Sequence, residues 1–334
     1  MRPLSHDSQQ LFSRRLLRGQ EARYRVIVSN VLPAISLRGL TKRYGRTPAV
    51  DNLTLDVLPG EIFGFLGLNG AGKTTTIRIL LDLLRPTSGT AFVLGHHCRT
   101  DSLAVRAAVG YLPGEIAYYG DMTGRQVLGL LDRLGRERVR PELQRELLER
   151  FLLTPDDLDR RLREYSTGMK RKLGLVQAFQ ADPPLLILDE PTEGLDPLMQ
   201  EAVYDLLAEV RRRGRTVFMS SHVLPEVGRV CDRIGVLRGG TLALVAPVDE
   251  VRNLAPRRVH VTFAVDIERP DVAWPTGVEL ADATARRWSL SVRGPLGPVV
   301  HRLATLPVAD LHVEEPQLED VVIGYYREPL GESR

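Results

Sequence analysis

Cysteine, lysine and long apolar segments are all scarce in this chain of 334 residues. Its two cysteines, Cys98 and Cys231, lie far apart in the sequence, which argues against a disulfide framework and is typical of a reducing compartment. No apolar run approaches the roughly 18 residues that span a bilayer, so no membrane-spanning helix is expected. The net charge of +3 is ordinary for a globular protein of this size, and no nucleic-acid partner is expected from it.

The phosphate-binding pattern G-x-x-x-x-G-K-[ST] occupies residues 67–74, directly after the apolar run 62–66. A strand, a glycine-rich loop and a helix in that order surround a polyphosphate with backbone N–H groups and the positive end of a helix dipole. Lys73 is expected to reach the β- and γ-phosphates, and Thr74 a Mg²⁺ ion. The pattern predicts a nucleoside triphosphate site. The residues expected to bind the nucleotide here are Gly67, Asn69, Gly70, Ala71, Gly72, Lys73, Thr74 and Thr75.

A second motif, residues 185–190, is an apolar run that ends in two carboxylates. It is typical of a buried parallel strand that delivers acidic side chains to the carboxyl edge of a sheet. Asp189, at the end of this strand, suits a role at Mg²⁺. Glu190, one residue later, suits a general base that polarises the attacking water. A phosphate loop with this second acid predicts hydrolysis as well as binding.

Between these motifs, residues 165–179 join a Ser-x-Gly turn to an amphipathic segment. Ser166 is therefore expected to cap a helix whose free N–H groups form a second anion site. With this motif, the chain resembles the ATP-binding subunits of ABC transporters over roughly residues 34 to 245. The resemblance implies that two subunits enclose two ATP molecules head to tail. Ser166, Thr167 and Gly168 would then face the nucleotide of the partner subunit.

Three further residues take roles from this resemblance. Tyr44 matches the aromatic residue on which the family stacks adenine. Asp196 matches the family's loop between subunits and so a nucleotide-binding role, although a helix N-cap followed by Pro197 would explain both residues locally. His222, after an expected strand at 216–219, matches the histidine that contacts the γ-phosphate and holds the attacking water.

Two positions depart from the family's motifs. Thr167 stands where the family has a glycine and is expected to loosen the approach of backbone to phosphate, unless its hydroxyl donates to the phosphate instead. Gly114 stands where the family has a glutamine that binds Mg²⁺. Glu115, the next residue, is the candidate replacement, because a carboxylate is a hard Mg²⁺ ligand. The alternative, that Glu115 plays no such part, stays open.

The expected fold class is α/β: a P-loop NTPase sheet with an antiparallel β subdomain and a helical insert, followed by a small C-terminal α+β accessory domain. The insert is expected to hold helices over 123–134, 141–153 and 155–163. Strands are expected at 259–265 and 288–292, with a helical segment within 295–306. The expected domains are an Arg-rich extension, 1–33, the nucleotide-binding domain, 34–245, and the accessory domain, 246–334.

By the resemblance, the chain is expected to be the ATP-hydrolysing motor subunit of a membrane exporter, with ATP and Mg²⁺ as cofactors. Lys73 would stabilise the phosphoryl charge, with Glu190 as base and His222 as clamp. The expected partners are membrane permease subunits and a second nucleotide-binding subunit, identical or different, at the cytoplasmic face of the membrane. The alternative is a soluble ABC-type ATPase that acts on nucleic acid or ribosomes. One phosphate loop, with no tandem duplicate and no coiled-coil span, favours the exporter.

Overall fold

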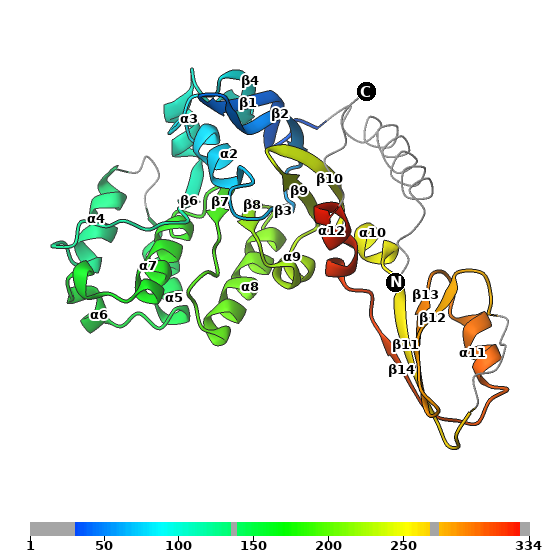
Figure 1. Ribbon diagram of the computed structural model, residues 1–334. Helices are drawn as coiled ribbons and strands as arrows, with labels where there is room; N and C mark the ends of the chain where they lie inside the picture. The colour runs from blue at the N-terminus through cyan, green and yellow to red at the C-terminus, as the bar shows by residue number, and fades with distance from the viewer. Residues whose placement is uncertain (1–30, 135–138, 268–273, 328–334) are drawn as a thin grey trace.

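The computed structural model describes residues 31–134, 139–267 and 274–327, and within them the chain forms three sheets with helices packed against them (Figure 1). The predicted Arg-rich extension, 1–33, lies almost entirely outside the described residues. Among the described helices, none combines the length and the apolarity that a bilayer crossing requires.

A six-stranded sheet in the order β10-β9-β3-β8-β7-β6 forms the centre of the molecule. All its neighbouring strands pair in parallel except β10, which pairs antiparallel with β9. Every residue of β3 and β7 is buried, as expected for parallel strands that are covered on both faces. The carboxyl ends of β3, β7 and β8 therefore meet at one edge. The strands are β3 (Ile62–Leu66), β6 (Val109–Leu112), β7 (Leu185–Asp189), β8 (Thr216–Ser221), β9 (Arg233–Arg238) and β10 (Thr241–Pro247).

An antiparallel sheet in the order β2-β1-β4-β5 lies on the far side of helix α2 (Lys73–Leu80) from the central sheet (Figure 1). One hydrophobic cluster contains residues of both sheets and of α2, so the β subdomain shares its core with the nucleotide-binding edge. This cluster anchors the helix that begins at the phosphate loop. The elements are β1 (Ile35–Tyr44), β2 (Thr47–Val57), β4 (Ser88–Val93), β5 (His96–His97) and, after them, α3 (Ser102–Ala107).

The helical insert contains α4 (Gly124–Leu134), α5 (Pro141–Arg150) and α6 (Pro155–Asp159). The predicted start of α6 is confirmed, because Thr154 and Asp157 form a capping box. Its predicted end at residue 163 is wrong: Arg160 is extended, with ψ 152°, and only a 3-10 turn follows at Leu162–Glu164. Helix α5 also ends before 153, since Leu152 adopts φ 53°.

Three more helices complete the covering of the sheet: α7 (Thr167–Phe179), α8 (Pro197–Arg212) and α9 (Leu224–Val230). Side chains cap two of them as predicted. Ser166 accepts a hydrogen bond from the backbone N–H of Met169, and Asp196 from that of Met199. Pro197 is the first residue of α8.

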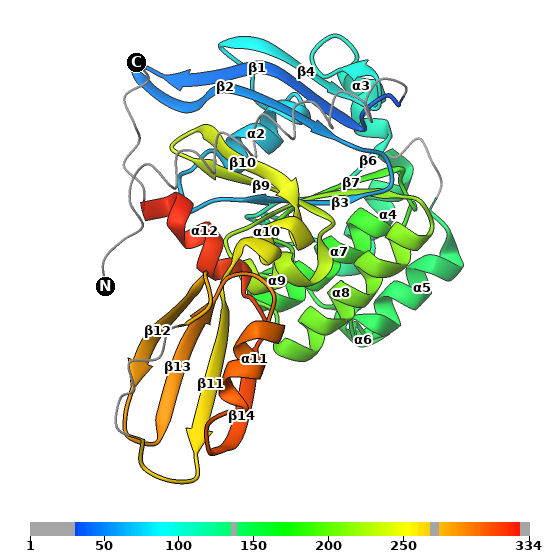
Figure 2. The same cartoon turned by 90° about the vertical axis from the view of Figure 1, so that its right-hand side faces the viewer.

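The C-terminal residues form an antiparallel sheet, β12-β13-β11-β14, which projects from the rest of the molecule with helix α11 against it (Figure 2). Its core is separate and includes an edge-to-face pair, Phe263 and Trp288, with ring centroids 4.7 Å apart. The flanking helices α10 and α12 instead contribute to the main core. The elements are α10 (Val248–Leu254), β11 (Arg257–Phe263), β12 (Val278–Ala283), β13 (Arg287–Val292), α11 (Gly297–Leu303), β14 (Val308–Glu314) and α12 (Leu318–Arg327).

Candidate nucleotide-binding site

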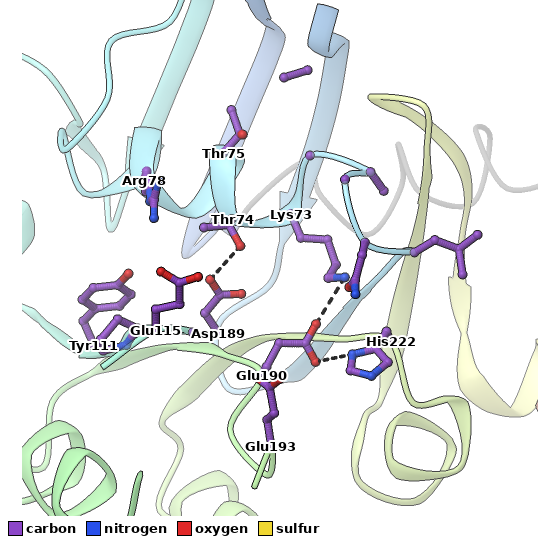
Figure 3. Close-up of a pocket in the computed structure, with 18 residues that line it drawn as sticks. Lys73, Thr74, Thr75, Arg78, Tyr111, Glu115, Asp189, Glu190, Glu193 and His222 are labelled. Atoms are coloured by element: carbon purple, nitrogen blue, oxygen red, sulfur yellow. Dashed lines mark hydrogen bonds and ion pairs between the residues drawn. The ribbon is translucent and has the colours of Figure 1, made fainter. Parts of the chain in front are cut away.

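A cavity of about 370 Å³ opens at the carboxyl edge of the central sheet, between the phosphate loop and the ends of β7 and β8 (Figure 3). It brings together residues that are up to 173 positions apart in the chain, from Ala49 to His222. Its lining consists of Ala49, Leu68, Asn69, Gly70, Ala71, Gly72, Lys73, Thr74, Thr75, Arg78, Tyr111, Pro113, Gly114, Glu115, Asp189, Glu190, Glu193 and His222.

The phosphate loop is shaped by a glycine that no other residue can replace without strain. Gly72 has φ 108°, and a Cβ added to it would lie 2.3 Å from the carbonyl oxygen of Ala49. The loop turns there into α2, so that Lys73 is the first helical residue. The Lys73 ammonium is buried and donates a hydrogen bond to the carbonyl of Gly67 at 2.6 Å. A buried cation thus faces the cavity from the loop.

The carboxylate of Asp189 is fixed by hydroxyls on both sides. Thr74 Oγ1 donates to Asp189 Oδ2 at 2.9 Å, and Ser220 Oγ donates to Oδ1. The Glu115 carboxylate lies beside Asp189 in the same cavity (Figure 3). These hydroxyl and carboxylate oxygens are the donors that Mg²⁺ prefers, so the residues present fit a Mg²⁺ site.

Glu190 lies between two basic side chains. Its Oε1 is 3.2 Å from Lys73 Nζ, and its Oε2 is 2.9 Å from Nδ1 of His222 (Figure 3). Its backbone has φ 53°, a left-handed conformation that costs a residue with a Cβ on the order of 1 kcal/mol or more. Hydrogen bonds from the Glu190 N–H to Ser220 hold it there. The arrangement presents a carboxylate, a proton acceptor, to the part of the cavity next to Lys73.

The other predicted nucleotide contacts lie outside the cavity lining. Tyr44 ends β1 with 54% of its surface exposed, and the Lys42 ammonium is 5.3 Å from its ring centroid. Ser166, Thr167 and Asp196 are exposed at the starts of α7 and α8. Contacts of these residues with adenine or with a partner's nucleotide stay predictions.

Several residues that line the cavity are not among the predicted site residues. Arg78, Tyr111 and Glu193 line the cavity, and burial together with the nearby Asp189 charge raises the pKa of Tyr111. Ser220 could have been found, since it lies near the end of β8, the strand next to β7 in the sheet, and two residues before His222. Arg78 and Tyr111 become neighbours only through folding.

The chain matches known proteins over most of the region that forms this site. Residues 50–193 match a family model described as ABC transporter. A Streptomyces coeruleorubidus daunorubicin resistance ATP-binding protein is 40% identical over 222 residues, which are 66% of this chain and 70% of that protein. A Nod factor export ATP-binding protein I from Paraburkholderia xenovorans is 38% identical over 301 residues, 86% of this chain and 99% of that protein.

Some relatives are much longer, and the match spans only 14% of their length. Among solved structures, the ATP binding subunit of an ABC transporter superposes with a TM-score of 0.61 at 29% identity. That match covers 66% of this chain and 92% of the other.

Proposed function

Because the chain belongs to the ABC transporter family and is an ATPase of that family, we propose that it is the motor subunit of a membrane exporter. The observation that carries the catalytic part of the proposal is the position of Glu190 between Lys73 and His222 at the mouth of the phosphate loop. Export is supported by the names of relatives that include a Nod factor export protein.

We assign each side chain a task from its contacts. Lys73 and the loop N–H groups bind the β- and γ-phosphates. When the phosphates bind, the Lys73 ammonium moves away from Glu190 Oε1. That oxygen is then free to accept a proton from the attacking water. His222 orients the carboxylate through its bond to Oε2. Thr74, Asp189 and Glu115 would hold Mg²⁺, which when bound would offset the charge of the phosphates.

The exposed start of α7 supports a second part of the proposal, a head-to-tail pair of subunits. Ser166 and Gly168 lie outside the cavity of their own chain. As residues of an ABC family member, they would contact the nucleotide that is bound to a partner subunit. Two chains, or this chain and a similar one, would close on two ATP molecules. They would act on separate permease subunits from the cytoplasmic face of the membrane.

The test of catalysis is Glu190→Gln in the full chain. Removal of the base should lower ATP turnover by about 10²-fold or more, with ATP affinity changed only a few-fold. Lys73→Ala should lose both. Glu142→Gln, the same exchange at an exposed position of α5, should match the wild type. If Glu190→Gln turns over ATP as fast as Glu142→Gln does, Glu190 is not the general base.

Export is tested by the partners of the chain. Affinity capture of the full chain from detergent-solubilised membranes of its host should recover a polypeptide with several membrane-spanning helices. Recovery of ribosomal proteins or nucleic acid in its place would favour the alternative, a soluble ABC-type ATPase. Because the two experiments are independent, a failure of the export proposal leaves the assignment of Glu190 standing.

A further inference from the structure

Arg171, on the second turn of α7, is a buried cation that bonds two segments of the site, 113–114 and 189–193. Only 4% of its surface is exposed. Its Nη atoms donate to the carbonyl oxygens of Pro113 at 3.0 Å, of Gly114 at 2.8 Å and of Asp189 at 3.4 Å. Its Nε donates to the carbonyl of Glu193 at 3.2 Å, and an Nη to the Glu193 carboxylate at 3.3 Å.

This pattern of partners is costly for a residue that serves stability alone. Four of the five acceptors are backbone carbonyls, and the one carboxylate, that of Glu193, is 57% exposed and so screened by water. Burial lowers the pKa of Arg171, and the nearby charges of Glu193, Asp189 and Glu190 offset only part of the loss of hydration. An apolar side chain could fill the same space, but it would leave the four carbonyls without this donor. It also could not hold the two backbone segments in one geometry.

The loop at 113–115 is held so close to the carboxylate of Asp189 that a side chain at position 114 has little room. A Cβ added to Gly114 would lie 3.0 Å from Asp189 Oδ2, tighter than ordinary van der Waals contact. The Gly114 carbonyl is the atom that accepts the shortest bond from Arg171. The guanidinium therefore keeps this loop against Asp189, and the next residue, Glu115, lines the cavity as a result.

The same guanidinium flanks the strained general base. Glu190 has a left-handed backbone, which persists only where the surroundings fix it. Ser220 bonds the Glu190 N–H on one side. Arg171 bonds the carbonyls of Asp189, just before it, and Glu193, three residues later. The two contacts bracket the segment that carries the base.

We infer that Arg171 is a positioning residue for ATP hydrolysis: it clamps the loop at 113–115 and the segment 189–193 so that Glu115 and Glu190 face the phosphates. The inference rests on the proposed roles of these two carboxylates. Because Arg171 contacts neither the P-loop nor Lys73, its loss should spare ATP binding and impair the chemical step. Displacement of catalytic groups by about 1 Å can lower a rate on the order of 10²-fold.

The test compares Arg171→Met and Arg171→Lys with Lys172→Met in the full chain. Lys172→Met removes the same charge one residue further along α7. Arg171→Met should lower kcat by about tenfold to a hundredfold and raise the Mg²⁺ concentration for half-maximal activity several-fold. The Kd for ATP, measured with Mg²⁺ omitted, should change less than about threefold. Arg171→Lys should be intermediate, because one ammonium cannot reach all five acceptors.

The outcomes separate the clamp from a structural role. If the kcat of Arg171→Met equals that of Lys172→Met, the inference is overturned. It is also overturned if Arg171→Met loses kcat and ATP affinity by the same factor while its Mg²⁺ dependence stays that of the wild type. If Arg171→Met does not fold, Arg171→Lys decides: wild-type kcat and Mg²⁺ dependence in that variant overturn the clamp. Inactive wild-type protein, or an active Glu190→Gln variant, would instead count against the proposed function.

Discussion

A buried carboxylate on α9 leads to a prediction about Tyr204. Glu226, on α9, is 7% exposed and accepts hydrogen bonds from Tyr204 Oη and Ser221 Oγ, each at 3.1 Å, and from Thr192 Oγ1. Its donors come from α8, from the end of β8 and from the segment after Glu190. Burial and the Glu226 carboxylate raise the pKa of Tyr204, so its hydroxyl stays protonated and donates.

The change is Tyr204→Phe, which removes this donor and leaves the ring. The Arg229 guanidinium, 4.9 Å from the ring centroid, can still pack on it. A hydrogen bond to a charged group contributes about 1.5–3 kcal/mol. We therefore expect the free energy of unfolding to fall by about that much. At roughly 2–4 °C per kcal/mol, the melting temperature should fall by at least 3 °C or so.

Tyr118→Phe is the matched control. The Tyr118 hydroxyl is also inside the protein, but it donates to a neutral amide, Gln177 Oε1, at 3.3 Å. Its loss should cost only about 0.5–1.5 kcal/mol. Denaturant unfolding followed by circular dichroism measures both variants under one condition. If Tyr204→Phe destabilises the protein no more than Tyr118→Phe, the Glu226 cluster does not have the charged character that its geometry indicates.

Two further predictions concern the charge cluster around Asp182 and the residue Thr167 at the start of α7. Burial raises the pKa of Asp182, but Arg215 and neighbouring arginines lower it more, so the net pKa is depressed. The ionised Asp182 therefore stabilises the fold above the pKa of the unfolded chain, about 4, and this contribution is lost as the pH falls through the lower folded-state pKa. Unfolding experiments should show Asp182→Asn destabilised at pH 7 and closer to wild type at pH 3. Thr167→Gly should keep or raise ATPase activity if Thr167 only loosens the approach of backbone to phosphate. A loss in Thr167→Gly, with Thr167→Ser intact, would assign its hydroxyl a phosphate contact instead.

The sequence was most informative where function depends on consecutive residues. The phosphate loop at 67–74 and the strand at 185–190 carry their geometry locally, so the position of each relative to the sheet could be predicted. Helix starts were also predictable, because a cap and its partner are three residues apart. The end of α6 was not, since it depends on one extended residue, Arg160, in a charged segment with no glycine or proline.

Contacts between distant segments carried no such signal. Arg171 donates to residues 57 and 58 positions before it, and Ser220 to a carboxylate 31 positions before it. In the sequence Arg171 is one of three consecutive basic residues at the start of an amphipathic helix, a pattern that is typical of a solvated face. Only the packing of α7 against β6 brings it under the loop at 113–115.

Gly114 shows how the geometry changes the meaning of a sequence departure. Compared with the family motif, the glycine at position 114 removes a glutamine that binds Mg²⁺. In the structure, a Cβ at this position would approach Asp189 Oδ2 to 3.0 Å, and the loop is held there by the bond from Arg171 to the Gly114 carbonyl. A glutamine would require the loop or Asp189 to shift, which would strain the contacts of Arg171. Gly114, Glu115 and Arg171 therefore form one arrangement, in which the small residue lets the next carboxylate lie beside Asp189.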